Sequence, residues 1–263
     1  TRSTGYDHID VKYCKKKKIL VINTPYYGEN TVAEQAFALI LALSRKLVES
    51  IEKTKKRNFS LDGLRGFDLK GKTLGIIGTG SIGSHMAEIA KGFEMKILAN
   101  SNSKRPELVK KFGVKYVALE NLLKNSDIIT LHVPLIKGTR HLINKKSIKL
   151  IKKGAYLINT SRGEIVDTAA LISALDKKIL AGAGLDVLED GEFIKEEKQL
   201  LSKKFTREKL LNMLENNILL NYKNVIITPH NAFNTQEALN RILNTTIENI
   251  NSIIKGKVKN LVK

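Results

Sequence analysis

A glycine-rich loop is the part of the sequence whose residue types and spacing point most directly to chemistry. The segment Gly78–Gly83 has glycines at its first, third and last positions, follows an apolar run and opens a helical pattern. Gly78 allows a tight turn, Gly80 lets a phosphate approach the backbone, and Gly83 lets the helix pack on the strand. Ser81 and Ile82, at the helix N-terminus, offer free N–H groups to an anion. The loop predicts a dinucleotide-binding site, with a tight turn that binds no ligand as the alternative.

The end of the next predicted strand, Lys96–Ala99, bears on which dinucleotide is bound. In dinucleotide-binding folds an acidic residue about 20 positions further along binds the ribose hydroxyls of NAD. Ser101 and Asn102 occupy that place here, and Lys104 and Arg105 follow. Because these side chains could hold a 2′-phosphate that a carboxylate would repel, we expect NADP(H) to be favoured over NAD(H). Hydroxyl contacts to an unmodified ribose are the alternative.

The elements that must position this loop alternate along the chain. Short apolar runs, most of them without in–out alternation, predict strands buried on both faces of a parallel sheet. These runs are Ile19–Asn23, Leu74–Gly78, Lys96–Ala99, Asp127–Leu131, Ala155–Asn159, Ala183–Asp186 and Val225–Thr228. The predicted helices are Thr31–Lys56, with Thr31 as its cap, Ser81–Phe93, Pro106–Phe112, Ser147–Ile151, Thr168–Asp176 and Thr235–Lys255. Strands that alternate with helices predict an α/β fold with a doubly wound parallel sheet of the Rossmann type.

The composition is that of a globular protein, with 263 residues of which 42% are hydrophobic and 27% charged. No apolar run is long enough for a bilayer span, so we expect no membrane association. The single Cys14 argues against a multi-cysteine metal site and favours a reducing compartment, the cytoplasm. The formal net charge is +19, from 45 Lys and Arg against 26 Asp and Glu. These basic residues are scattered without a nucleic-acid motif, so we expect solvated faces rather than nucleic-acid binding.

Seven short segments follow one another in an order that is typical of a single family. They are Arg2–Asp10, Thr31–Leu39, Gly75–Gly83, His132–Pro134, Asn159–Gly163, Gly184–Val187 and Pro229–Phe233. Together they resemble the D-isomer-specific 2-hydroxyacid dehydrogenases, especially the D-lactate dehydrogenase-like branch. Chains of this family carry a further segment before the part that resembles Arg2–Asp10. The resemblance therefore implies an N-terminally truncated member.

The resemblance implies a Rossmann-type nucleotide-binding domain joined to part of a flavodoxin-like substrate domain. Residues 1–27 are expected to be a remnant of the substrate domain, and residues 28–232 the dinucleotide-binding domain. Residues 233–263 are expected to form a C-terminal helix that returns to the substrate domain. The long helix from Thr31 resembles the dimer-forming helix of the family, which implies a homodimer, with simple core packing as the alternative.

The implied activity is the reversible NAD(P)-dependent reduction of a small 2-oxo acid to a D-2-hydroxy acid. The resemblance assigns Arg162 to the substrate's carboxylate and carbonyl oxygen, and His230 to general acid/base catalysis. The residue types suit these roles, because a planar guanidinium reaches both oxygens and histidine titrates near neutrality. The family's Glu partner of the histidine falls on Gly191 here, so we expect the neighbouring Glu192 to take its place. Without a carboxylate partner the imidazolium is less favoured, and activity should fall at higher pH.

The resemblance further implies residues that line the cofactor and the substrate. For the cofactor they are His132, Val133, Pro134, Thr160 and Asp186, the last on the nicotinamide carboxamide side. For the substrate they are the backbone around Thr4 and Gly5, and the aromatic side chain of Phe233. No metal site is expected.

A rival function is a nucleotide-sensing binding protein, like the corepressors that share this fold. The intact Arg162 and His230 favour the enzyme. The loss of the Glu at Gly191 and the basic surface favour the rival. Turnover of 2-oxo acids distinguishes the two.

Overall fold

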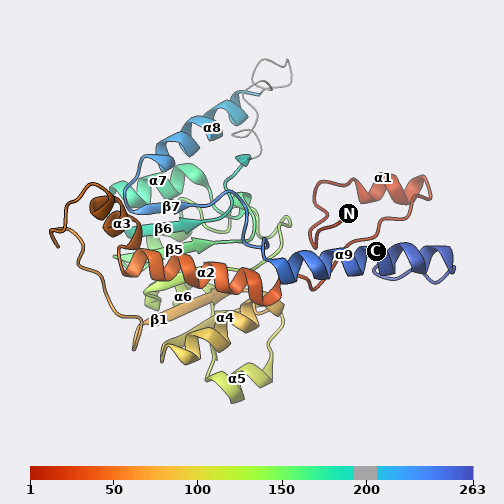
Figure 1. Cartoon of the computed structure of the whole chain (residues 1–263), viewed down its shortest axis with the longest axis horizontal. Coiled ribbons are helices and arrows are strands. Elements are labelled where there is room, and N and C mark those ends of the chain that lie inside the picture. Colours follow the sequence, from red (N-terminus) through yellow and green to blue (C-terminus); the bar gives the residue numbers. More distant parts are fainter. Residues whose placement is uncertain (192–205, 263) are drawn as a thin grey trace. The chain divides into compact units, whose positions relative to one another are not determined.

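The computed structural model describes residues 1–191 and 206–262, which divide into two compact units (Figure 1). The first unit consists of Thr1–Val32 and Asn231–Lys263, and the second of Ala33–His230. Within the described ranges, none of the helices combines the length and the apolar character that crossing a membrane requires.

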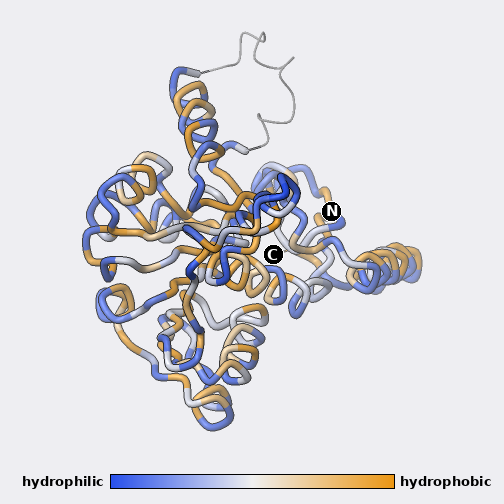
Figure 2. Tube along the Cα trace, turned by 60° about the vertical axis from the view of Figure 1, so that its left-hand side comes forward, coloured by the Kyte–Doolittle hydropathy of each residue, from blue (hydrophilic) through white to orange (hydrophobic). Residues whose placement is uncertain are grey.

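A parallel sheet forms the centre of the second unit. Among the described residues it has seven strands in the order β3-β2-β1-β4-β5-β6-β7, and every neighbouring pair runs parallel. The strands are β1 (Thr73–Ile77), β2 (Lys96–Asn100), β3 (Lys115–Tyr116), β4 (Ile128–Leu131), β5 (Ala155–Asn159), β6 (Leu180–Leu185) and β7 (Val225–Ile227). Figure 2 shows hydrophobic segments in the sheet and hydrophilic loops between the elements. The predicted doubly wound Rossmann-type fold is confirmed.

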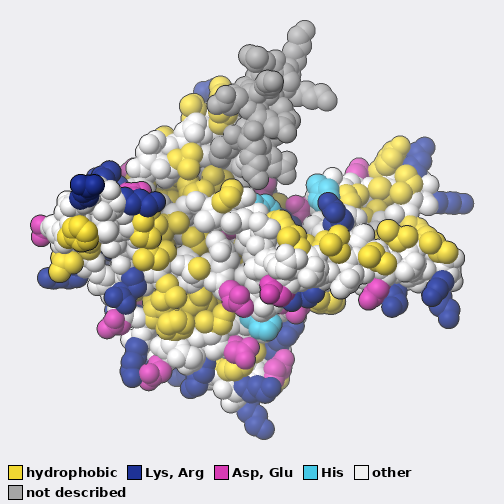
Figure 3. Space-filling model, in the orientation of Figure 1, with side chains coloured by type: hydrophobic (Ala, Val, Ile, Leu, Met, Phe, Trp, Pro, Cys, Tyr) yellow, Lys and Arg dark blue, Asp and Glu magenta, His cyan; other side chains and the backbone are white. Residues whose placement is uncertain are grey.

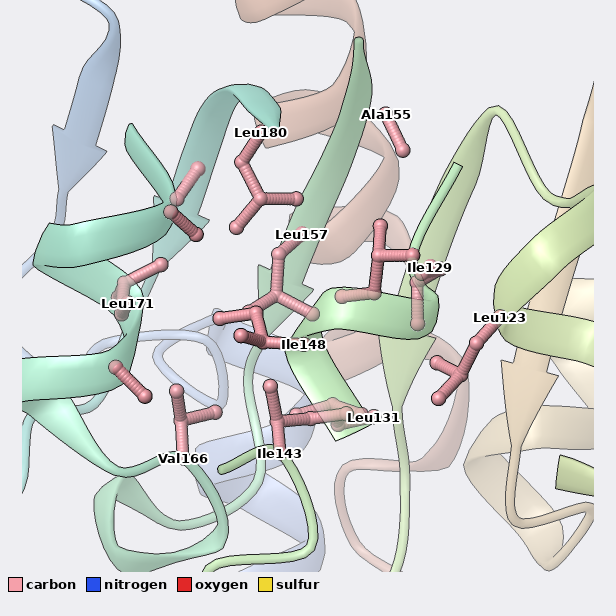
Figure 4. Packing of buried hydrophobic residues seen from close by; sticks show 14 of the residues in the cluster. Leu123, Ile129, Leu131, Ile143, Ile148, Ala155, Leu157, Val166, Leu171 and Leu180 are labelled. Carbon is pink, nitrogen blue, oxygen red and sulfur yellow. The ribbon is translucent and has the colours of Figure 1, made fainter. Parts of the chain in front are cut away.

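Helices cover both faces of this sheet, because neighbouring residues of a strand point to opposite sides. The helices are α2 (Glu29–Ser44), α3 (Leu47–Lys55), α4 (Ser81–Gly92), α5 (Pro106–Phe112), α6 (Leu119–Asn125), α7 (Thr168–Asp176) and α8 (Arg207–Leu220). On one face Ile76 and Ile128 pack with side chains of α2, α4 and α5. On the other, Ile129 and Leu157 pack with α6 and α7 (Figure 4). The predicted helix Ser147–Ile151 is a 3-10 turn.

The predicted helix Thr31–Lys56 is wrong in its extent, because α2 and α3 are separate helices. Lys46, between them, adopts a left-handed conformation with φ of 52°. In a continuous helix the Ser44 carbonyl would accept the N–H four residues later; instead it accepts the N–H of Phe67 at 2.9 Å. A Cβ atom at Gly66 would lie 2.0 Å from that carbonyl oxygen, so glycine is needed where the distant segment crosses.

Two further expectations, both for the first unit, are wrong. The predicted strand Ile19–Asn23 is reduced to an isolated antiparallel bridge between Ile22 and Leu261, because only this short C-terminal segment pairs with it. Thr31 does not cap α2, which begins before it, and its hydroxyl instead accepts from Arg241 Nη2 at 3.2 Å.

Two helices of the first unit are α1 (Val11–Lys16) and α9 (Gln236–Ile254). The α9 helix confirms the predicted C-terminal helix, and the Thr235 side chain caps it by accepting the N–H of Ala238 at 3.2 Å. On the face drawn in Figure 3, Lys and Arg side chains are scattered among apolar and acidic ones. The described part of that face therefore has no single basic stripe of the kind that binds nucleic acid.

Candidate active site

The register of the sheet places five of the predicted site residues, one from each of five strands, in one row. The paired residues that end the strands, in sheet order, are Asn100, Ile77, Leu131, Asn159, Leu185 and Ile227. The residues that follow them are Ser101, Gly78, His132, Thr160, Asp186 and Thr228. Because all these strands are parallel, this row lies along the carboxyl edge of the sheet, where such folds bind ligands.

The glycine loop has the backbone that phosphate binding requires. Gly78 has φ of 95°, and a Cβ atom there would lie 2.4 Å from the His132 carbonyl oxygen and 2.8 Å from Val133 Cγ1. A Cβ atom at Gly83 would lie 2.0 Å from the Gly78 carbonyl oxygen, so the first turn of α4 packs directly on the loop. Gly80 is the N-cap of α4 without a capping side chain, and nothing lies within 4 Å of its missing Cβ. This open cradle at a helix N-terminus fits a pyrophosphate.

The segment after β2 is anchored to the glycine loop by a chain of hydrogen bonds. The Tyr116 hydroxyl donates to Thr79 Oγ1 at 3.0 Å and accepts from the Arg105 N–H at 3.0 Å. Arg105 Nη1 donates to Ser84 Oγ at 3.3 Å, on the first turn of α4. Thr79, Ser84 and Tyr116 were not among the predicted site residues. Their signal in the sequence is weak, because only Thr79 lies inside the motif.

The other predicted residues of this segment differ in exposure. Ser101 is half-buried, whereas Asn102 and Lys104 are exposed. The Arg105 guanidinium lies near the pyrophosphate cradle, because it donates to Ser84 on the first turn of α4, whereas the Lys104 side chain is exposed to solvent.

Two buried polar atoms in the row have no hydrogen-bond partner among the described residues. They are Nδ1 of His132 and Oγ1 of Thr160, which follow the paired ends of β4 and β5. Burial lowers the pKa of His132 to about 3, so its ring is neutral at physiological pH. Its Nε2 lies 2.7 Å from Thr130 Oγ1. Unpartnered polar atoms are costly in a protein interior, which fits a polar ligand here.

The loop that carries Arg162 is held by Asn159, the last residue of β5. Asn159 is buried, and its Nδ2 donates to the Arg162 carbonyl at 2.8 Å. Its Oδ1 accepts from both the N–H and the hydroxyl of Ser161, at 3.0 and 2.9 Å. Arg162 Nη1 donates to the Ser161 carbonyl at 2.8 Å, and the side chain is half-buried. Asn159 is a positioning residue that was missed, although an amide at a strand end beside an arginine is a usable signal.

His230 follows β7 and is exposed, with a left-handed backbone at φ of 55°. Nine other non-glycine residues of the described chain share this conformation, so it does not by itself mark a functional site. The His230 N–H donates to the Thr228 carbonyl at 2.9 Å, and the Thr228 hydroxyl donates to the buried carboxylate of Asp186. Asp186 follows β6, the strand between β5 and β7. Arg162 and His230 therefore leave the sheet on either side of Asp186.

The remaining predicted residues lie elsewhere. Pro134 is exposed on the segment after β4. Thr4, Gly5 and Phe233 belong to the first unit, where Phe233 contacts Tyr27 edge to face with ring centroids 6.3 Å apart. Glu192 lies outside the described residues. The substrate roles and the partnership of Glu192 with His230 stay predictions. Within the described ranges, His, Cys, Asp and Glu side chains form no group of three or more that could hold a metal ion.

The parallel sheet, the glycine cradle and the row of strand-end residues define a Rossmann-type dinucleotide-binding protein. A sequence model of the D-isomer specific 2-hydroxyacid dehydrogenase NAD-binding domain matches residues 37–232. The chain therefore belongs to the D-isomer specific 2-hydroxyacid dehydrogenase family, and the resemblance seen in the sequence is confirmed.

Known proteins similar to this chain agree with that assignment. A glyoxylate reductase of Thermococcus litoralis is 42% identical, over 97% of this chain and 73% of its own length. The crystal structure of a D-lactate dehydrogenase from Aquifex aeolicus, complexed with NAD and lactic acid, is 46% identical with a TM-score of 0.89. The match extends over 98% of this chain and 76% of the Aquifex chain. The structure of an acyclic imino acid reductase in complex with NADPH and D-Arg is 34% identical, with a TM-score of 0.83. That match extends over 100% of this chain and 77% of the reductase chain.

Family membership makes this protein an oxidoreductase acting on CH–OH donors. With a nicotinamide cofactor it interconverts 2-oxo and 2-hydroxy acids. The chain spans about three quarters of the length of these relatives.

Proposed function

We propose that the protein reduces a short 2-oxo acid to the D-2-hydroxy acid, as D-lactate dehydrogenases do. The observation that carries this proposal is the placement of Arg162 and His230. They follow β5 and β7 on either side of Asp186, each shortly after a residue of the row, Thr160 or Thr228, that also includes Gly78 of the glycine loop. A fixed cation and a proton donor beside a dinucleotide site are the groups that carbonyl reduction needs.

In this proposal Arg162 binds the substrate and stabilises charge. Its guanidinium donates to the substrate carboxylate and to the carbonyl oxygen, which becomes an alkoxide as the carbon is reduced. Asn159 holds the Arg162 backbone through the 2.8 Å hydrogen bond to its carbonyl. A donor that is held before the reaction begins does not need to reorganise as charge develops.

His230 supplies the proton in the same step. A bound nicotinamide supplies the hydride, and the His230 imidazolium gives its proton to the oxygen of the reduced carbonyl. The glycine loop and the α4 N-terminus would hold the pyrophosphate of the cofactor, and Asp186, the neutral His132 and Thr160 would contact the rest of it. A carboxylate partner for His230 is still a prediction that rests on Glu192.

The two units take different roles in the proposal. The second, with the sheet and the glycine loop, binds the dinucleotide. The first contains Thr4, Gly5 and Phe233, whose substrate roles stay predictions. The single Cys14 is consistent with a reducing compartment, and a cytoplasmic location is part of the proposal.

The experiment is to follow consumption of NADH or NADPH by absorbance with a series of unbranched 2-oxo acids of increasing length. We expect turnover that is fastest with the shortest members and gives the D-product. Cofactor binding without turnover of any 2-oxo acid would favour a nucleotide-sensing binding protein instead. The relatives reported above are all dehydrogenases or reductases, so they give that second function no support.

We further propose that NADP(H) is preferred. One support is the half-buried Ser101, which stands where a ribose-binding carboxylate would repel a 2′-phosphate. The other is Arg105, whose Nη1 lies 3.3 Å from Ser84 Oγ on the first turn of α4. Charge-assisted hydrogen bonds to a phosphate contribute about 1.5–3 kcal/mol each. One or two of them, weakened by solvent at this edge, favour NADPH by about 10- to 100-fold.

The measurement is a pair of fluorescence titrations, with NADPH and with NADH, on the wild type and on Ser101→Asp. We expect tighter NADPH binding in the wild type and the reverse in Ser101→Asp, because the new carboxylate repels the 2′-phosphate and accepts from the ribose hydroxyls. Ser101→Ala is the matched control, since it removes the hydroxyl without adding charge. A wild type that prefers NADH would show that Arg105 and Lys104 form no phosphate site.

We also propose a homodimer that forms through the segment around α3. Phe59 and Leu61, which follow α3, are 76% and 82% exposed, and Leu47 and Val48 at the start of α3 are also exposed. Exposed apolar side chains that follow one another closely in the sequence fit a segment that forms a protein–protein interface. Leu61→Asp should therefore shift the protein toward the monomer in analytical ultracentrifugation. The control Val109→Asp, at an exposed apolar residue of α5, should not, and a monomeric wild type would rule the dimer out.

A further inference from the structure

Glu189 is a buried carboxylate in the loop after β6 that the proposed chemistry does not use. Its side chain is 5% exposed. Oε1 lies 2.6 Å from His141 Nε2 and 3.6 Å from Arg140 Nη2, and Oε2 accepts from Thr168 Oγ1 at 3.2 Å. Its backbone carbonyl accepts from Asn216 Nδ2 at 2.8 Å. Burying a carboxylate costs much free energy unless it is paired in this way, so the burial of Glu189 depends on these partners.

The backbone at Glu189 lies directly against the loop that carries Arg162. A Cβ atom at Gly163 would lie 2.1 Å from the carbonyl carbon and oxygen of Leu188 and 2.3 Å from the Glu189 nitrogen. Only a glycine allows two backbones to approach so closely. A shift of the Glu189 segment therefore has to move Gly163, and with it the adjacent Arg162.

His141 connects the Glu189 side chain to the loop that carries Arg162. Its N–H donates to the Glu164 carbonyl at 2.8 Å, so its backbone is tied to the Arg162 loop while its side chain is tied to Glu189. Two residues further along, Ile143 forms a parallel bridge with Val166. Both of these are buried, and Figure 4 shows them side by side in the core. The loops after β4, β5 and β6 are thus joined in a ring that is anchored in the core.

We propose that Glu189 is a positioning residue for Arg162. By holding His141 and Thr168, its carboxylate keeps the Leu188–Glu189 backbone pressed on Gly163, and this sets where the Arg162 guanidinium meets the substrate. This inference rests on the proposed role of Arg162 in binding the 2-oxo acid. The glycine cradle lies on β1 and α4, outside the ring. His132, Thr160 and Asp186, which are assigned to the cofactor, directly follow their strands, before the segments that form the ring. We therefore expect the Kd for NAD(P)H to be nearly unaffected by a change at Glu189.

The first test compares Glu189→Ala with Glu189→Gln in the full chain. Because a displacement of about 1 Å can cost on the order of 10²-fold, we expect Glu189→Ala to lower kcat/KM for the 2-oxo acid by about 10- to 100-fold. KM should rise and kcat should fall while the Kd for NAD(P)H is unchanged. Glu189→Gln, whose amide can still bond to both His141 and Thr168, should restore most of the activity. Glu94→Ala, at an exposed ion pair with Lys70, is the control and should change none of these values.

The second test places Glu189→Ala in an Arg162→Lys background. If Glu189 acts through Arg162, the double variant should lose little beyond Arg162→Lys alone. An equal fold-loss in both backgrounds, or a Kd for NAD(P)H that rises with Glu189→Ala, would overturn the inference. Near-normal activity of Arg162→Lys alone would instead overturn the proposed role of Arg162, and the inference with it. His141→Ala, which removes the more exposed member of the pair, gives the same comparison should Glu189→Ala fail to fold.

Discussion

Replacing His230 with Gln is expected to lower kcat for 2-oxo acid reduction by about 10²- to 10⁴-fold, the usual contribution of a positioned general acid. Gln keeps the approximate size and a hydrogen-bond donor, but it cannot release a proton to the reduced oxygen. The Kd for NAD(P)H should stay nearly unchanged, because the pyrophosphate cradle lies on β1 and α4 rather than after β7. Steady-state kinetics with the preferred 2-oxo acid and a fluorescence titration with the cofactor measure the two effects.

His85→Gln is the matched control for this substitution. His85 lies on α4, partly exposed and 3.4 Å from Glu88, so the same change there should leave kcat intact. The pH profile adds an independent reading. Reduction by the wild type should slow as pH rises and the imidazolium loses its proton, whereas the residual activity of His230→Gln should lack that slope. A His230→Gln variant with most of the wild-type kcat would remove His230 from the mechanism.

Replacing Arg162 with Lys is expected to lower kcat/KM by about 10²- to 10³-fold, as when one preorganised donor to an oxyanion is lost. The ammonium retains the positive charge, but it lacks the planar fork that reaches the carboxylate and the carbonyl oxygen together. KM for the 2-oxo acid should rise and kcat should fall, since both the bound substrate and the developing alkoxide lose a donor. The Kd for NAD(P)H should again stay near the wild-type value.

Arg207→Lys serves as the control, because Arg207 is exposed at the start of α8. A rise in KM without any change in kcat would show that Arg162 contributes only binding and does not stabilise the alkoxide. Unchanged kinetics would leave the substrate carboxylate to other donors and would contradict the proposed mechanism.

Much of the sheet was predictable because several of its strands, such as β1 and β4, are buried on both faces. β1, β2, β4, β5, β6 and β7 are short apolar runs, and each lies within a few residues of its predicted place. The two-residue strand β3 is too short to leave such a pattern. The helix α6 was not predicted; it has seven residues and begins after Ala118 without a capping side chain, so few local signals mark it.

The candidate site was predictable where its chemistry depends on consecutive residues. The glycine spacing in Gly78–Gly83 predicts a phosphate-binding turn, because Gly83 packs on the Gly78 carbonyl and Gly80 faces an opening, both inside one strand–turn–helix unit. Arg162 and His230 were assigned by the family resemblance. Their places after two strands of a parallel sheet supported that assignment, because such strands end at one edge. The sequence by itself therefore determined the fold class, the cofactor cradle and the two residues expected to carry the reaction.

Only the tertiary structure decided how distant segments meet. The break between α2 and α3 depends on the N–H of Phe67, which takes the Ser44 carbonyl that a continuous helix would have used. The pairing of Glu189 with His141 joins residues 48 positions apart, and no local sequence pattern around either residue predicts the other. Which N–H takes a carbonyl, and which group pairs with a buried carboxylate, depends on the groups that packing brings close together. Local spacing does not encode these contacts, because they exist only after the elements have packed.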